Sequence, residues 1–143
     1  MLATRVPTDL YLRVQQFYAR QMQALDDLRF TEYAATFTED GSFQHAPGVE
    51  PARGRAAILG VLEDFNRRFE DDPVQRRHWF NQIVLDEQED GSLRSTVYTL
   101  VVHARPGVRQ PEIAPSCVVH DVLEVTDGEV LTRSRLVTYD HLV

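Results

Sequence analysis

The chain has 143 residues, 43% of them hydrophobic, and a formal net charge of −7. All fifteen positive charges are arginines, which excludes Schiff-base chemistry on lysine, the usual anchor of pyridoxal phosphate and a standard phosphate-binding loop. The acidic balance argues against a nucleic-acid partner. Length and composition together predict that residues 1–143 form one domain with a packed core.

Cysteine content and hydropathy bear on the location of the protein. Cys117 is the single cysteine, so no intrachain disulfide can form. No apolar run is long enough to span a membrane, and residues 1–9 are too polar for a secretory signal. We therefore expect a cytoplasmic protein with no membrane partner.

The first part of the chain is predicted to be helical. Apolar residues recur at helical spacing over residues 8–27, and Thr8 is the expected N-terminal cap. Gln21 lies within this apolar stripe, so its amide must bind a partner or face a cavity. A shorter helix is expected over residues 29–38, and a third helix over residues 54–70.

Extended structure dominates the second half of the chain. Asp-Gly turns at residues 89–92 and 126–129 predict two hairpins. The predicted strands cover residues 42–45, 75–85, 93–104, 116–125 and 130–140. With helices first and most strands later, this order predicts an α+β fold. Three helices would cover the concave face of a curved antiparallel sheet and leave a cavity between the layers.

Four short runs resemble one protein family. Residues 24–30 place an aspartate four residues before an aromatic at a helix corner, and residues 37–43 are Phe-Thr-Glu-Asp-Gly-Ser-Phe. Residues 54–58 are Gly-Arg-Ala-Ala-Ile, and residues 77–81 combine Arg-His with an asparagine three residues later. Together these runs resemble the SnoaL-like family, whose nuclear transport factor 2 fold is a cone-shaped α+β barrel.

Two further runs narrow the resemblance. Residues 15–22 and 74–79 look like SnoaL-like proteins of bacterial aromatic polyketide clusters of the actinorhodin type. This resemblance implies a cofactor-independent cyclase, dehydratase or isomerase acting on an aromatic polyketide. The fold also hosts non-catalytic members, so an accessory subunit of the same pathway and a ligand-binding protein without chemistry are alternatives. Proteins of this fold often pair through the open face of the sheet, which implies a homodimer.

The resemblance also implies the catalytic residues, Asp26 and His78. Dehydratases of this fold carry an aspartate at the helix corner, paired with a histidine on a strand. A carboxylate beside an imidazole can fix its tautomer and stabilise the imidazolium. An imidazole can take a proton from carbon and give one to a leaving hydroxyl. An exposed helix-end aspartate and a structural histidine are the competing interpretations.

Further candidates follow on the neighbouring strands. Alternation puts Phe80 on the same face as His78, whereas Asn81 needs a bulge to join them. His103 corresponds roughly to a second histidine of the scytalone-dehydratase-like branch. His103 and Tyr98 are separated by an odd number of positions, so in a regular strand only one of these two side chains faces the inside of the fold.

The last two strands leave choices open. His120 and Asp121 alternate, so one of them faces inward, and comparison with the family favours Asp121. Arg133 and Arg135 are expected on one face. They form either a solvated ion pair with a group such as Glu124 or a clamp for an anion or a carbonyl.

Gln21 marks a departure from the family pattern. Several dehydratases of this fold have a tyrosine five residues before the corner aspartate, where this chain has an amide that can donate a hydrogen bond instead. No His-x-x-x-His or Cys-x-x-Cys pair is present, so no metal is expected. The predicted substrate-binding residues, in a partly aromatic pocket, are Gln21, Phe30, Trp79, Phe80, Asn81, Tyr98, His103, Asp121 and Arg133.

Overall fold

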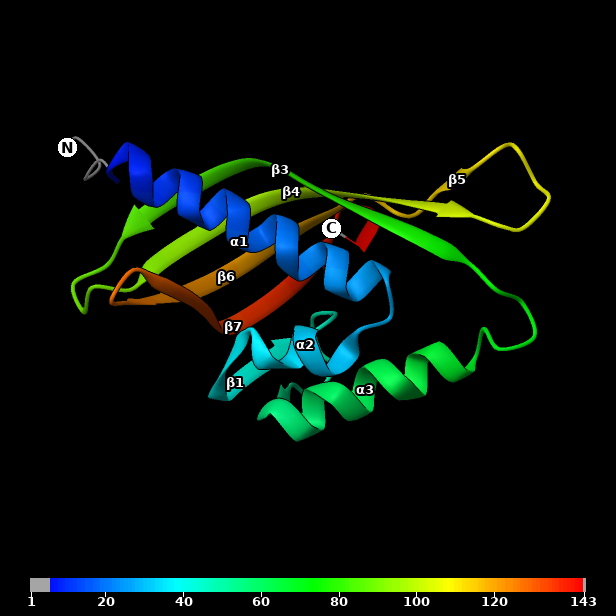
Figure 1. Cartoon of the computed structure of the whole chain (residues 1–143), viewed down its shortest axis with the longest axis horizontal. Coiled ribbons are helices and arrows are strands. Elements are labelled where there is room, and N and C mark those ends of the chain that lie inside the picture. The colour runs from blue at the N-terminus through cyan, green and yellow to red at the C-terminus, as the bar shows by residue number, and fades with distance from the viewer. Residues whose placement is uncertain (1–5, 143) are drawn as a thin grey trace.

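Three α-helices and a seven-stranded sheet form the computed structural model, which describes residues 6–142 (Figure 1). Residues 1–5, the larger part of the segment judged too polar for a secretory signal, lie outside the described residues, as does residue 143. None of the helices in the described part of the chain combines the length and hydropathy needed to cross a membrane.

The strands follow the predicted order, with two short additions. The order across the sheet is β2-β1-β7-β6-β4-β3, and β5 pairs with the outer part of β4. The bounds are β1 Phe37–Gln44, β2 Ala52–Arg53, β3 Gln75–Glu87, β4 Leu93–Ala104, β5 Glu112–Ile113, β6 Cys117–Thr126 and β7 Glu129–Tyr139. The short β2 and β5 were not predicted.

The sheet is mixed rather than wholly antiparallel. β1 runs parallel to β7, whereas the other pairs are antiparallel. A parallel pair needs a long crossover, and here the crossover contains α3 and all the other strands. The prediction of a fully antiparallel sheet is therefore wrong at this pair. β2 and β3 stand at opposite ends of the strand order, so the predicted cone is open and the sheet does not close on itself.

The helices are shorter than predicted. α1 is Thr8–Asp26, α2 is Phe30–Ala35 and α3 is Arg55–Arg67. The N-cap of α1 is Pro7, and no side chain caps the helix, so the expected Thr8 cap is wrong. α2 ends early because Phe37 joins the sheet, where the N–H of Thr132 donates to the carbonyl of Thr36 at 2.9 Å.

Two β-bulges change which side chains face inward. In β3 the register shifts between Asn81 and Val84, and Gln82 takes a φ of 52°. Before the bulge, residues 78 and 80 are the less exposed ones, whereas after it Ile83 and Leu85 are buried. In β7, Leu123 of β6 pairs with Thr132 and Val122 pairs with Ser134, so Arg133 is the extra residue of a bulge. A bulge adds one residue to one strand and so inverts the alternation beyond it.

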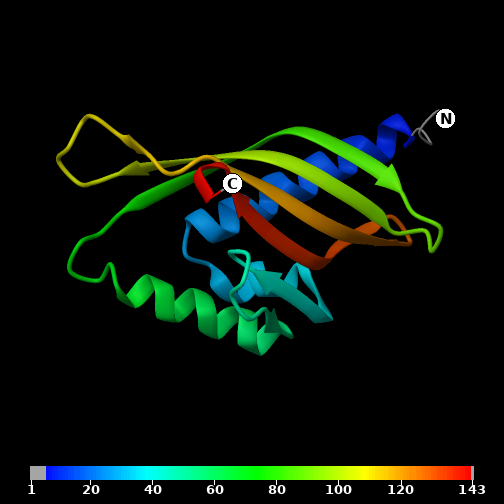
Figure 2. The ribbon, with the colours of Figure 1, turned by 180° about the vertical axis from the view of Figure 1, so that it is seen from behind.

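The core has two apolar clusters on the helical side of the sheet. One cluster packs α1 against the sheet through residues such as Val14, Tyr18 and Val97. The other joins α2, α3 and β1 through residues such as Tyr33 and Ile58. Figure 2, from behind, shows the sheet in front of α1, so α1 covers only the inner face. The end of α1 belongs to the second cluster through Met22 and Ala24.

Candidate active site

Asp26 and His78 meet where the end of α1 contacts the start of β3. The Nδ1 atom of His78 lies 2.5 Å from Asp26 Oδ1, and the backbone N–H of His78 donates to Asp26 Oδ2 at 3.0 Å. The side chain of Asp26 is 6% exposed and that of His78 is 18% exposed. A single residue thus binds both oxygens of the carboxylate, which fixes the orientation of the imidazole.

The backbone at the end of α1 holds Asp26 in place. Asp26 is the last residue of α1, Leu28 takes a φ of 61°, and the N–H of Arg29 donates to the carbonyl of Ala24 at 2.8 Å. The left-handed conformation costs a residue such as leucine about 1–2 kcal/mol, so surrounding contacts must maintain this corner. One such contact is Gln75 at the start of β3, whose side chain donates to the carbonyl of Asp26 at 3.1 Å.

The geometry assigns a role to each nitrogen of His78. An ionised carboxylate only accepts hydrogen bonds, so Nδ1 carries the hydrogen that faces Asp26. Nε2 then holds the lone pair, and it has no hydrogen-bond partner among residues 6–142. His78 can accept a proton at Nε2 while Asp26 stabilises the resulting imidazolium.

A second, deeper network occupies the space between α1 and the sheet, where we expected a cavity. Arg135 donates to Asp121 through two nitrogens, at 2.9 and 2.7 Å, to the hydroxyl of Tyr33 at 2.8 Å and to the Gln21 side-chain oxygen at 2.7 Å. The side chains of Arg135 and Asp121 are 2% and 0% exposed. Of His120 and Asp121, Asp121 is therefore the residue that faces inward, as the comparison with the family favoured. Its partner is the buried Arg135.

The other polar groups of this network are also hydrogen-bonded. Tyr18 donates to Asp121 at 2.8 Å and lies 2.8 Å from the hydroxyl of Ser95. Burial, followed by the charge of Asp121, raises the pKa of Tyr18 well above its ordinary value. Burial opposes the charge on Arg135, but Asp121 and the two tyrosines outweigh it, so the pKa of Arg135 lies above its ordinary value. Tyr18 therefore stays neutral and Arg135 stays charged over the physiological range.

Gln21 belongs to this network and does not face a free space. Its amide nitrogen donates to Thr36 Oγ1 at 2.7 Å and Thr132 Oγ1 at 3.2 Å, and its oxygen accepts from Arg135. Since the amide hydrogens and the oxygen are all engaged and the residue is fully buried, Gln21 is not placed to polarise a substrate carbonyl. Its predicted contact with substrate is corrected accordingly.

Arg76 and His103 lie on the inner face beyond His78. Arg76 pairs with His103 across β3 and β4, and alternation puts Arg76 on the face of His78. Arg76 is half-buried against the end of α3 and the turn after it, with its guanidinium carbon 5.1 Å from the ring centroid of Phe65 and 4.4 Å from that of Phe69. Burial, then Arg76 and Arg105, lower the pKa of His103 below its ordinary value.

Three predicted site residues lie on the opposite face of the sheet. Trp79 and Tyr98 are 60% and 61% exposed, and Asn81 is also exposed and pairs with Tyr98. The β3 bulge follows Asn81 instead of preceding it, so Asn81 lies on the same outer face as Trp79. These three side chains do not join Asp26 and His78, and their assignment to the same pocket is wrong.

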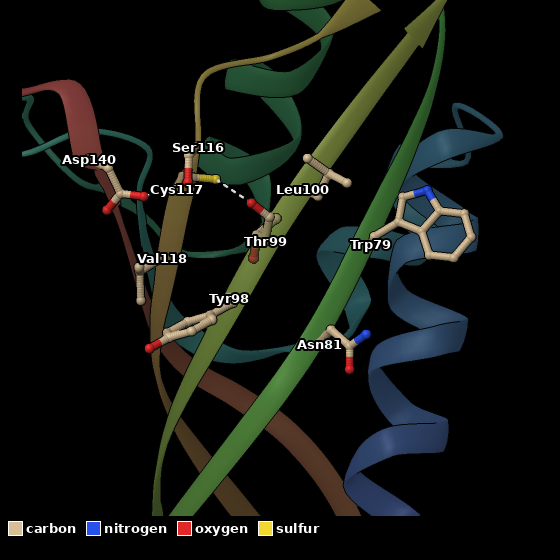
Figure 3. A pocket seen from close by; sticks show the side chains of 9 residues that line it. All are labelled: Trp79, Asn81, Tyr98, Thr99, Leu100, Ser116, Cys117, Val118 and Asp140. Carbon is tan, nitrogen blue, oxygen red and sulfur yellow. Dashed lines mark hydrogen bonds between the residues drawn. The ribbon is translucent and has the colours of Figure 1, made fainter. Parts of the chain in front are cut away.

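Those outward residues line a separate hollow of about 560 Å³ (Figure 3). It is open, and neither Asp26 nor His78 lines it. The Sγ of Cys117 lies 3.6 Å from the carbonyl of Thr99 beside it. The hydroxyl of Thr99 is buried and has no hydrogen-bond partner in the described part of the chain. The lining residues are Trp79, Asn81, Tyr98, Thr99, Leu100, Ser116, Cys117, Val118 and Asp140.

Arg133 is separated from Arg135 by the bulge in β7. It donates to Glu124 at 2.8 Å and to Asp90 at 3.2 Å, with a side chain that is 39% exposed. This is the solvated ion pair that the sequence left open as the alternative to an anion or carbonyl clamp. His120 is exposed and lies 3.0 Å from the hydroxyl of Thr138.

The two remaining aromatic candidates pack in the core. Phe80 lies on the inner face, edge-on to Tyr18 with ring centroids 5.2 Å apart. Phe30 begins α2 and packs against the cluster of α2, α3 and β1. No group of three or more histidine, cysteine, aspartate or glutamate side chains in residues 6–142 is arranged to hold a metal ion.

Sequence reasoning missed Tyr18, Tyr33 and Arg76 as neighbours of the predicted residues. Tyr18 follows Val14 by four residues and so shares its helix face, which is the signal that could have placed it inside. Arg76 precedes His78 by two, so strand alternation could have placed it. For Tyr33 the helical spacing indicated only a core position.

Comparison with known proteins identifies relatives over nearly the whole chain. The model of the SnoaL-like domain family matches residues 8–135. No protein with curated annotation matches the chain. These results confirm the family resemblance and the α+β fold predicted from the sequence.

Three solved structures show the similarity. ActVI-ORFA from Streptomyces coelicolor is 53% identical, with 92% of this chain and 98% of that chain covered and a TM-score of 0.87. A protein from Catenulispora acidiphila, solved in complex with S-DNPA, is 47% identical, with 95% and 97% covered and a TM-score of 0.82. Aln2 from a Streptomyces species is 33% identical, with 97% and 96% covered and a TM-score of 0.88.

Proposed function

The chain belongs to the SnoaL-like family, and on that premise we propose that it is a cofactor-independent enzyme of aromatic polyketide tailoring. The proposed reaction is a proton transfer that closes a ring, eliminates water or moves a double bond. The observation that carries the proposal is the contact between His78 Nδ1 and Asp26 Oδ1 at 2.5 Å, which leaves Nε2 without a hydrogen-bond partner among residues 6–142.

The proposed mechanism uses both members of the pair. Nε2 of His78 takes a proton from a carbon next to a substrate carbonyl, and the pair of electrons moves onto that carbonyl as an enolate. Asp26 holds the Nδ1–H tautomer and stabilises the imidazolium. The imidazolium then returns the proton to carbon or oxygen, or to a departing hydroxyl.

One feature, the residue at position 21, favours ring closure or enolisation over dehydration. The position where dehydratases of this fold carry a tyrosine is Gln21, and all its polar atoms are engaged. The substrate carbonyl would then need another donor. S-DNPA, the compound bound to the relative from Catenulispora acidiphila, is the first compound to test as a substrate or product.

The test is turnover of a polyketide intermediate by the purified protein and by His78→Gln. Removing a general acid–base group lowers turnover about 100-fold to 10,000-fold, and the amide keeps a similar size at a site that is not fully buried. His120→Gln is the matched control, because His120 is exposed and, among residues 6–142, its side chain is hydrogen-bonded only to Thr138. Equal turnover by the wild-type and His78→Gln proteins would exclude the mechanism. Absence of turnover by the wild-type protein would favour a non-catalytic accessory subunit.

We also propose that the protein forms a homodimer through the outer face of the sheet. The supporting observation is the set of exposed apolar side chains there, which includes Trp79, Tyr98 and Leu100. Exposed apolar patches of this kind mark interaction surfaces. Sedimentation equilibrium should give twice the chain mass for the wild type and a smaller mass for Tyr98→Glu. A wild-type protein that remains monomeric at micromolar concentration would contradict the proposal.

A further inference from the structure

One buried side-chain oxygen in the described part of the chain has no hydrogen-bond partner, and it is the hydroxyl of Thr99. The residue is only 7% exposed. Among the other buried threonines, Thr38 donates to a carboxylate at 3.1 Å, and Thr132 accepts from Gln21 at 3.2 Å. Leaving a buried polar group unpaired costs free energy, so almost all such groups in native proteins have a partner. The free hydroxyl of Thr99 therefore points to a partner that is not part of the chain.

The side chain of Thr99 faces the helices. Along β4, residues 95, 97 and 99 are buried and alternate with more exposed neighbours. The hydroxyl of Ser95 lies 2.8 Å from that of Tyr18 in α1, and Val97 belongs to the core cluster around α1. Thr99 is the next inner position after Val97. It also borders the outer hollow, where its carbonyl lies beside Cys117, but alternation turns its side chain to the inner face.

The strand register places Thr99 beside His78. His78 pairs with Val101 across β3 and β4, and Phe80 pairs with Thr99. Because His78 and Phe80 are on the inner face of β3, Thr99 is the diagonal neighbour of His78 on that face. The Cα atoms of such neighbours are about 7–8 Å apart. Nε2 of His78 also lacks a hydrogen-bond partner in the described residues, so a free base and a free donor share one side of the sheet.

A threonine hydroxyl at this place can bind a ligand that His78 also contacts. It carries one O–H donor and no charge. Rotation about χ1 between staggered positions exchanges the hydroxyl with the methyl group, so the donor can turn toward such a ligand. Contacts of about 3 Å from each side would place a carbonyl oxygen at Thr99 and the carbon next to that carbonyl at His78.

We propose that Thr99 is a catalytic residue whose hydroxyl donates to the substrate carbonyl while His78 removes the proton from the adjacent carbon. The C–H electron pair forms the new carbon–carbon double bond, the carbonyl electron pair moves onto oxygen, and the hydroxyl proton stays on Thr99. The hydrogen bond strengthens as negative charge develops on that oxygen, which lowers the barrier. Thr99 thus supplies the donor that Gln21 is not placed to supply. This assignment rests on the proposed function, because it takes His78 as the base.

The first test is Thr99→Val, which removes the hydroxyl and keeps the branched shape. Turnover of a polyketide intermediate should fall about 100-fold or more, because one donor to the developing oxyanion is lost. The melting temperature should stay the same or rise, because the removed hydroxyl had no partner. Thr99→Ser keeps the hydroxyl and should turn over faster than Thr99→Val. A merely structural hydroxyl would give the opposite pattern, with lower stability and unchanged turnover.

Two other threonines provide matched controls. Thr96 is on the same strand, and alternation puts it on the outer face, where it pairs with His120 of β6. Thr96→Val should therefore leave turnover unchanged. Thr132 is buried like Thr99, but its hydroxyl accepts from Gln21, so Thr132→Val should lower the melting temperature. This second control shows that the measurement detects a lost hydrogen bond.

A second readout does not depend on turnover. 2-Naphthol bound beside His78 mimics an enol, and its ionised form mimics the enolate. The absorbance of naphtholate gives the ratio of ionised to neutral ligand in the complex. A hydrogen-bond donor stabilises the anion more than the neutral form. At fixed pH we therefore expect this ratio to fall about tenfold in Thr99→Val and to stay unchanged in Thr96→Val.

The outcomes separate this assignment from the proposed function. Full turnover by Thr99→Val, an unchanged naphtholate ratio in that variant, a melting temperature that falls as in Thr132→Val, or no binding of 2-naphthol would each overturn the assignment. Loss of turnover in His78→Gln with full turnover in Thr99→Val would retain the proposed function and remove the role of Thr99. A naphtholate ratio that requires Thr99, in a protein that shows no turnover, would support the donor and remove the proposed mechanism.

Discussion

The molecule contains two carboxylate-centred pairs on the inner side of one sheet, and they differ in what they leave unsatisfied. Asp121 accepts from Arg135 and Tyr18, and each of its oxygens has at least one donor. Asp26 is also fully engaged, but its partner His78 keeps one nitrogen without a hydrogen bond among residues 6–142 and is 18% exposed. The structural pair is fully hydrogen-bonded, whereas the candidate catalytic pair keeps one imidazole nitrogen that can accept a proton.

This difference follows from the chemistry of the two cations. A guanidinium cannot lose its proton under ordinary conditions, and the surroundings of Arg135 strengthen that tendency. An imidazole has a second nitrogen that can gain or lose a proton near neutral pH. Burial alone would therefore have selected Asp121 and Arg135, the more buried pair, over the candidate catalytic pair.

The largest effect is expected from Asp121→Asn. The substitution keeps the shape of the side chain but leaves Arg135 buried without a counter-charge, which costs about 3–5 kcal/mol. Urea unfolding followed by circular dichroism should show this loss in the free energy of unfolding. Arg133→Gln is the control, because it removes a partly exposed arginine of the same strand and should cost less than about 1 kcal/mol. Similar losses in the two variants would contradict the contrast between the deep pair and the surface.

A smaller loss of stability with a large loss of activity is expected from Asp26→Asn. The amide can still bind the backbone N–H of His78, so the free energy of unfolding should fall by only about 1–3 kcal/mol. An amide can donate to Nδ1, which favours the wrong tautomer, and it lacks the charge that stabilises the imidazolium. Turnover should therefore fall at least about 100-fold.

Asp27→Asn is the control for Asp26→Asn. Asp27 is the next residue, is exposed, and within the described part of the chain its side chain pairs only with the surface arginine Arg29. It should leave both turnover and stability close to those of the wild type. A variant with Asn at position 26 that retains full turnover would show that the carboxylate only supports the fold.

Much of the fold could be predicted from local chemistry. The Asp-Gly turns defined both hairpins, and the strand predicted over residues 93–104 has the observed bounds of β4. The sharp corner after α1 and the Arg-His run pointed to Asp26 and His78 through the family resemblance. Each of these signals depends on neighbouring residues, which is the information that a sequence carries most directly.

The errors arose where one extra residue changed the register. Counting from the turn, where Thr126 pairs with Glu129, would place Asp121 opposite Ser134, but the bulge places it opposite Arg135. Strict alternation likewise put Arg133 and Arg135 on one face. A bulge depends on pairing between strands, and a single sequence carries no clear signal of it. The parallel pair of β1 and β7 was also missed. It joins distant parts of the chain, so neighbouring residues carry no signal of it.

Because of the bulge in β3, the function of this strand in the fold depends on its exact number of residues, which its composition does not reveal. With Gln82 present, His78 faces the helices and so do Ile83 and Leu85. A deletion of that one position would restore simple alternation, and one end of the strand would have to rotate outward. Either the imidazole would leave its carboxylate or two core side chains would enter water. Insertions and deletions at this point are therefore far less tolerable than substitutions, even though the glutamine itself is exposed.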